Sequence, residues 1–141
     1  MGTESIPMEN QGPRILAVVQ DIFFAAKITA AAKRAGVEVS YVTDERELLG
    51  AGPLPQMIIV DLNNANLNNA NLKKQGLNPV ELIGKLKADP ATREVRVIGF
   101  LSHVQGDLKR EAELAGCDLV LPRSVFSQNL EDLLRGRSCH L

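Results

Sequence analysis

The sequence is poor in cysteine and carries almost no net charge. Only 2 of its 141 residues are cysteines, and neither belongs to a CxxC or Cys/His spacing, which argues against a disulfide scaffold and a zinc site. Lys and Arg number 16 against 17 Asp and Glu, so there is no excess positive charge to attract phosphate backbones or anionic lipid. We therefore predict no nucleic-acid partner, no membrane partner and a location in the reducing cytoplasm.

Long apolar runs are also missing, as are the common sequence motifs of nucleotide-binding proteins, hydrolases and metalloproteases. No segment approaches the roughly 20 apolar residues of a membrane span, and the first 13 residues lack the basic start and apolar run of a signal peptide. The sequence contains no GxxxxGKS/T loop, GxSxG elbow or HExxH pair. Its 45% hydrophobic and 23% charged residues are typical of one globular domain, predicted over 14–135, with tails at 1–13 and 136–141.

Short apolar segments alternate with amphipathic ones along the chain. Strands are predicted at 15–19, 37–42, 57–62, 95–102 and 118–122. Helices are predicted at 22–36, 78–89, 104–116 and 127–134, with a shorter one at 43–50, and Ser127 is expected to cap the last. Parallel strands need crossover connections, so this order predicts an α/β fold. We expect a five-stranded parallel sheet flanked by helices, in the flavodoxin-like, doubly wound three-layer sandwich.

Residues 63–76 interrupt this alternation. The segment reads NNANLNNANLKKQG, has no apolar stripe and contains Ala-Asn-Leu twice, five residues apart. Two copies of such a repeat cannot form a solenoid, because a solenoid buries its core only by stacking several turns. We interpret the segment as an Asn-rich insertion in the domain, since Asn is typical of polar turns.

Polar residues lie at the carboxyl ends of four of the predicted strands. In an open α/β sheet, ligands bind beyond the carboxyl ends of the strands, which meet at one edge. The residues at these ends are Gln20 and Asp21, Asp61, Ser102 and His103, and Arg123. We therefore predict that two carboxylates, a hydroxyl and a guanidinium meet in one shallow hollow.

Two longer segments carry a family resemblance. KLKADPATREVRVIGFLS is similar to the third helix, loop and fourth strand of the receiver domain of bacterial response regulators, and AGCDLVLPRSVF is similar to its AGAxxYLxKPF run. The resemblance extends from Arg14 to Leu134. It implies that Asp61 accepts a phosphoryl group, that Ser102 is the Ser/Thr that follows this group and that Arg123 stands at the lysine position. It also implies that Asp21, Asp61 and the carbonyl of Asn63 bind Mg²⁺. A carboxylate attacks phosphorus only where cations offset the repulsion between the two anions.

Several positions depart from the receiver pattern. Gln20 stands at the first acidic position, so the implied Mg²⁺ site is weakened by the loss of one charge. Arg123 replaces the lysine and exchanges a compact ammonium for a broad planar fork. Ser124 stands where the family has proline, Val120 where it has an aromatic ring, and His103 where it has a small residue.

These features favour a divergent, stand-alone receiver that is not an enzyme. We expect it to act as a protein-interaction module in a two-component-type phosphorelay, with a histidine kinase or a downstream effector as partner, and homodimerisation stays open. The contact face implied by the resemblance comprises the last two helices and the fifth strand, with charges such as Lys109, Arg110 and Glu113.

Three alternatives remain. In the first, the receiver is phosphorylation-competent and Asp61 accepts a phosphoryl group with Mg²⁺. In the second, Asp61 merely ends a strand, Ser102 bonds to backbone and Arg123 pairs with a surface acid. In the third, the chain is a flavodoxin-like cofactor-binding enzyme, but aromatic residues make up only 4% of it and it has no Trp, so few rings could enclose a flavin.

Overall fold

Five parallel strands form the centre of the computed structural model, which describes residues 14–19, 21–42, 54–63, 79–102 and 106–136. The sheet has the order β2-β1-β3-β4-β5, and every neighbouring pair is parallel. The strands are β1 (Arg14–Val18), β2 (Glu38–Tyr41), β3 (Met57–Asp61), β4 (Arg96–Leu101) and β5 (Leu119–Pro122).

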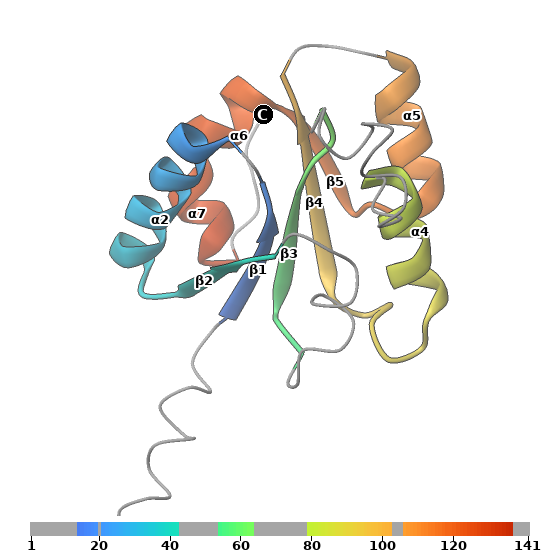
Figure 1. Ribbon diagram of the computed structural model, residues 1–141, viewed down its shortest axis with the longest axis horizontal. Helices are drawn as coiled ribbons and strands as arrows, with labels where there is room; N and C mark the ends of the chain where they lie inside the picture. Colours follow the sequence, from blue (N-terminus) through green and yellow to red (C-terminus); the bar gives the residue numbers. More distant parts are fainter. Residues whose placement is uncertain (1–13, 20, 43–53, 64–78, 103–105, 137–141) are drawn as a thin grey trace, which may run out of the picture.

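Helices cover both faces of this sheet. They are α2 (Ile22–Ala35), α4 (Pro79–Ala88), α5 (Gly106–Ala115), α6 (Arg123–Gln128) and α7 (Leu130–Leu134). Figure 1 shows α2, α6 and α7 on one side and α4 and α5 on the other. The predicted flavodoxin-like three-layer sandwich is therefore confirmed.

Strands β1, β3, β4 and β5 are mostly apolar because both of their faces are covered, whereas the edge strand β2 (EVSY) has no buried residue. Successive side chains of a strand point to opposite faces. In β1, Leu16 and Val18 belong to the core cluster under α4 and α5, whereas Ile15 and Ala17 belong to the cluster under α2, α6 and α7. The periodicity that marks a half-exposed strand is therefore absent from β1, as predicted for a strand inside a parallel sheet.

Helix α2 positions one of the predicted site residues. Asp21 is its N-cap, and Gly36 ends it in the left-handed region with a φ of 75°. Lys33 and Arg34 occupy its last turn, where their positive charges face the negative end of the helix dipole. The sequence prediction for this helix is confirmed at both ends.

The prediction for the last helix is wrong in its start and in its cap. Helix α6 begins at Arg123, directly after Pro122, and Ser127 lies inside it. Proline fixes φ without needing a backbone donor, so it can end a strand and precede a helix without a loop. Asn129 then separates α6 from α7, and its side chain donates to the Val125 carbonyl at 2.9 Å.

Some predictions concern segments outside the described residues. These are the tail at 1–13, Gln20, the helix at 43–50, the Asn-rich insertion beyond Asn63, His103 and the C-terminal tail beyond Gly136.

Candidate functional site

The structure brings the predicted site residues to one edge of the sheet. Asp61 is the last residue of β3, Asp21 precedes α2, Ser102 follows β4, and Arg123 follows β5. This edge holds the carboxyl ends of the strands and lies at the top of Figure 1. The convergence expected from strand ends is therefore present, and the roles of the residues follow from their contacts.

Asp21 divides its carboxylate between backbone and guanidinium. Its Oδ1 accepts hydrogen bonds from the backbone N–H groups of Phe23 at 2.9 Å and Phe24 at 3.2 Å. Its Oδ2 lies 3.6 Å from an Nη atom of Arg123. The cap holds this side chain at the mouth of the site, since both of its backbone partners belong to the first turn of α2.

Asp61 is the more buried of the two acids, with 5% of the residue exposed. Its Oδ1 accepts a hydrogen bond from the backbone N–H of Asn63 at 3.0 Å, and its Oδ2 lies 3.8 Å from the other Nη atom of Arg123. Burial raises the pKa of Asp61 above its ordinary value, although the Asn63 hydrogen bond and the Arg123 charge oppose the shift. The neighbouring Asp21 carboxylate adds to the rise in this pKa.

Arg123 lies between the two carboxylates and is packed against rings. Its guanidinium carbon is 4.8 Å from the centre of the Phe24 ring and 5.7 Å from that of Phe100. Such ring faces attract cations. The Arg123 Nε is buried and has no hydrogen-bond partner in the described part of the chain. The guanidinium is thus held by ring packing behind and by charge in front.

Ser102 is connected to the site by hydrogen bonds to the side chain of Asn63. The Asn63 Oδ1 accepts from the backbone N–H of Ser102 at 2.5 Å and from its hydroxyl at 3.2 Å. These bonds tie the chain after β3 to the chain after β4. Asn63 therefore contributes its side-chain oxygen to this connection and its N–H to Asp61.

The described chain is similar to solved structures of response regulators. A response regulator from Chloroflexus aurantiacus matches at 20% identity and a TM-score of 0.70, over 89% of this chain and 99% of that one. The chemotaxis response regulator CheY4 of Vibrio cholerae matches at 18% and 0.68, over 88% of this chain and 97% of that one. The fold is that of response-regulator receiver domains.

Other comparisons add to this result. The Mn²⁺-bound form of response regulator Rcp1 has the receiver fold, with 16% identity and a TM-score of 0.67 over 88% of this chain and 90% of that one. No protein-family model and no curated protein sequence matches the chain. The likeness therefore lies in the fold, while most side chains have changed.

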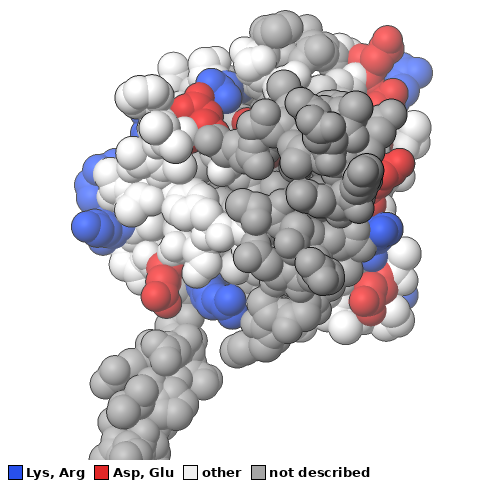
Figure 2. All heavy atoms as spheres, viewed as in Figure 1, with Lys and Arg blue, Asp and Glu red and all other residues white. Residues whose placement is uncertain are grey.

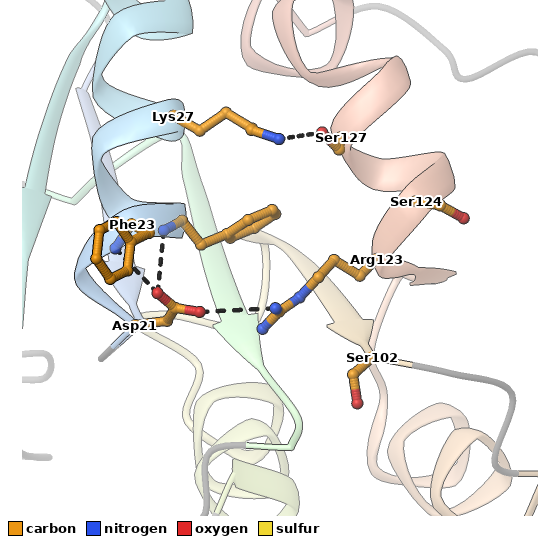
Figure 3. A pocket seen from close by; sticks show the side chains of 8 residues that line it. Asp21, Phe23, Lys27, Ser102, Arg123, Ser124 and Ser127 are labelled. Atoms are coloured by element: carbon orange, nitrogen blue, oxygen red, sulfur yellow. Dashed lines mark hydrogen bonds and ion pairs between the residues drawn. The ribbon is translucent and has the colours of Figure 1, made fainter.

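A hollow of about 430 Å³ opens beside Arg123 on this receiver fold (Figure 3). Arg123 reaches into it from α6 toward Asp21, and Lys27 reaches from α2 toward the Ser127 hydroxyl, 3.4 Å away. Its lining comprises Asp21, Phe23, Phe24, Lys27, Ser102, Arg123, Ser124 and Ser127.

Sequence reasoning missed Phe23 and Lys27 as members of this hollow. The Phe23 side chain is 82% exposed, and its neighbour Ile22 is 74% exposed. Helical spacing directs Phe24 into the core, and a residue adjacent to a buried one points elsewhere on a helix. The adjacent phenylalanines were therefore the available signal for an exposed ring.

The side chains, as they lie, fit a divalent metal ion poorly. Magnesium requires several oxygen ligands in near-octahedral geometry. Among the described residues, no group of three or more His, Cys, Asp or Glu side chains could hold a metal. Asp21 and Asp61 each use one oxygen on backbone N–H groups, and their other oxygens face Arg123. The guanidinium of Arg123 therefore faces the two carboxylates that the family resemblance implies as Mg²⁺ ligands.

Proposed function

We propose that this protein is a divergent receiver that acts as a protein-interaction module in two-component-type signalling. Its partner would be a histidine kinase or a downstream effector. The observation that carries the proposal is an exposed phenylalanine, Phe23, at the rim of the hollow on a receiver fold. Exposed aromatic residues beside a polar site are typical anchors of protein interfaces.

The surroundings of Phe23 suit a protein partner. Ile22 extends the apolar surface, while Lys27 adds a positive charge to the lining of the hollow. An apolar centre with a polar margin is the usual arrangement of a protein interface. Over the described part of the face drawn in Figure 2, acidic and basic side chains are interspersed, without a continuous patch of either sign.

The edge of the sheet offers a second part of the contact face. Strand β5 is the last strand of the sheet, with α5 on one side and α6 on the other. Lys109, Arg110 and Glu113 are exposed on α5. Exposed charges of both signs contribute to the choice of partner more than to affinity. No helix in the described ranges is both long and apolar enough to pass through a bilayer.

The experiment measures binding to the purified dimerisation domains of the histidine kinases of the same organism by titration calorimetry. We expect one of them to bind the wild-type protein, and Phe23→Asp to weaken that binding about tenfold. Leu54→Asp is the matched control, because Leu54 is 57% exposed and precedes β3 at the opposite end of the sheet. Equal loss in both variants would contradict the proposal, and the absence of any binding kinase would exclude a kinase and leave a downstream effector as the partner.

Phosphoryl transfer to Asp61 is the second candidate function. The side chain lies at the end of β3 with Arg123 3.8 Å away, so one positive charge is present to offset the repulsion between two anions. The poor fit to a divalent ion weighs against it. Incubation with acetyl phosphate decides the matter: a mass gain that is lost in Asp61→Ala would establish this function, and no gain would leave the interaction module alone.

A further inference from the structure

The oxygens that a metal ion would need are those that face Arg123. Asp21 and Asp61 each commit Oδ1 to backbone N–H groups. Their Oδ2 atoms lie 3.6 Å and 3.8 Å from the two Nη atoms of Arg123. A cation shared by the two acids would bind the same two Oδ2 atoms. The guanidinium and a metal ion would therefore compete for the same position beside these two Oδ2 atoms.

The guanidinium is held in this position from behind. It packs 4.8 Å from the centre of the Phe24 ring, and its side chain is 33% exposed. Helix α6 starts at Arg123 itself, directly after β5, so no loop lies between strand and side chain. A planar cation on ring faces is a favourable arrangement that a metal ion would have to disturb.

The charges oppose joint occupancy. Two carboxylates and one guanidinium sum to one negative charge, and the third acid of the receiver pattern is replaced by Gln20. A divalent ion added beside Arg123 would place three positive charges against two negative ones. Like charges a few ångströms apart in a partly buried site repel strongly. Binding of the ion therefore requires Arg123 to leave.

The contacts of Arg123 are nevertheless loose. Its distances of 3.6 Å and 3.8 Å to the acids exceed the roughly 2.8 Å of a charge-assisted hydrogen bond. Its Nε, buried, has no partner among the described residues. The side chain lies near both acids and offsets part of their charge without a short hydrogen bond to either, so it competes with a metal ion and does not exclude it permanently.

We propose that Arg123 is a built-in cation that competes with divalent metal ions for Asp21 and Asp61, so that these acids bind such ions well only when the guanidinium is removed. This property goes beyond the proposed interaction role and holds whatever partner the protein has. Arg123 also offsets part of the negative charge of the two acids without any metal ion.

Binding of Mn²⁺ alone, followed by the paramagnetic resonance signal of the free ion, tests the proposal. We expect Arg123→Met to bind Mn²⁺ about tenfold or more tightly than the wild type, since the two Oδ2 atoms are released. Arg123→Lys should lie between them, because a compact ammonium does not span both acids as a planar fork does. Adding Asp21→Asn to Arg123→Met should abolish the gain.

Arg34→Met is the matched control for charge. Arg34 pairs with Glu131 at 2.9 Å between α2 and α7, so its replacement removes one positive charge without touching the site. Equal affinity of wild type and Arg123→Met, or an equal gain in Arg34→Met, would overturn the proposal. The rise in Tm on adding Mn²⁺ is the second measurement. Should Arg123→Met not fold, Arg123→Lys decides: affinity equal to that of the wild type overturns the proposal.

Discussion

Each end of the sheet has one cationic side chain that contacts neighbouring elements, Lys87 at one end and Arg123 at the other, and the two are bound very differently. At the amino end, Lys87 of α4 lies 2.8 Å from the Asp118 carboxylate before β5, and donates to the carbonyls of Val95 at 2.8 Å and Arg93 at 3.1 Å. At the carboxyl end, Arg123 has two acids at 3.6 Å and 3.8 Å and an Nε without a partner in the described chain.

The difference separates a structural ion pair from a site. An ammonium group has three donors, and all three of Lys87 have acceptors at hydrogen-bond distance. The partner carboxylate of Asp118 also accepts the backbone N–H of Val97 at 2.8 Å, which joins β4 to β5. Arg123 has unused hydrogen-bonding capacity beside a hollow. A cation with spare capacity can respond to a ligand, whereas a saturated one can only hold the fold.

Removing the saturated cation should have the largest effect. Lys87→Met leaves the Asp118 carboxylate and two carbonyls without their donor, so we expect a loss of about 3 kcal/mol in the free energy of unfolding. Urea denaturation at neutral pH measures this loss. Lys109→Met, an exposed lysine on α5, is the control and should change stability by less than about 0.5 kcal/mol. Similar losses in both variants would show that the Lys87 contacts contribute little.

Crowding the same cation should cost somewhat less. Gly116 has a φ of +110°, and a Cβ there would lie 2.7 Å from the Cγ of Lys87. Gly116→Ala therefore strains the backbone and displaces the lysine, with an expected loss of about 2 kcal/mol. Gly84→Ala in α4 is the control, because a Cβ there meets nothing within 4 Å. It should stabilise the protein by about 0.5 kcal/mol, so thermal unfolding should shift in opposite directions in the two variants.

Removing the loosely held cation should change stability much less. Arg123→Met loses two long ion pairs and the packing of a cation on the Phe24 ring, while the methionine still fills part of that space. We expect a loss of about 1 kcal/mol in the same urea experiment, in keeping with partly exposed ion pairs. A loss as large as that of Lys87→Met would make Arg123 a structural residue and remove the contrast between the two ends.

The same contrast explains what the sequence could predict. The meeting of Asp21, Asp61 and Arg123 is predictable because each lies at or just after the end of a strand, and parallel strands end at one edge. The contact of Lys87 with Asp118 spans 31 residues and belongs to no periodic pattern, so no local sequence signal predicts it. The start of α6 was missed because Pro122 turns the strand directly into a helix.

The position of the Arg123 guanidinium between the two acids could not be predicted from residue types. Arg123 in place of a lysine indicated a changed site, but only the rings of Phe24 and Phe100 show why its charge lies between both acids. Those rings come from α2 and β4, far apart in the sequence. Side-chain packing between distant elements determines how the site residues are arranged, whereas the strand ends determine only where in the fold the site lies.

The smallest expected effect concerns the pH dependence of the site. Burial raises the pKa of Asp61, so the folded protein holds this proton more readily than the unfolded chain. Stability should therefore fall as pH rises from the ordinary aspartate range through the raised pKa, because the buried carboxylate ionises. Asp61→Asn lacks this titration and should gain stability relative to the wild type on going from pH 4 to pH 7, by less than the effect of Arg123→Met.

Urea unfolding of both proteins across that pH range measures the difference. Glu113→Gln on α5 removes an exposed carboxylate and is the control for a general effect of charge. If the Asp61→Asn gain is the same at both pH values, Arg123 neutralises the carboxylate so fully that its ionisation costs nothing, and the carboxyl end would then be as well compensated as the amino end. A gain that grows with pH instead shows that the two long ion pairs leave part of the burial cost of Asp61 unopposed.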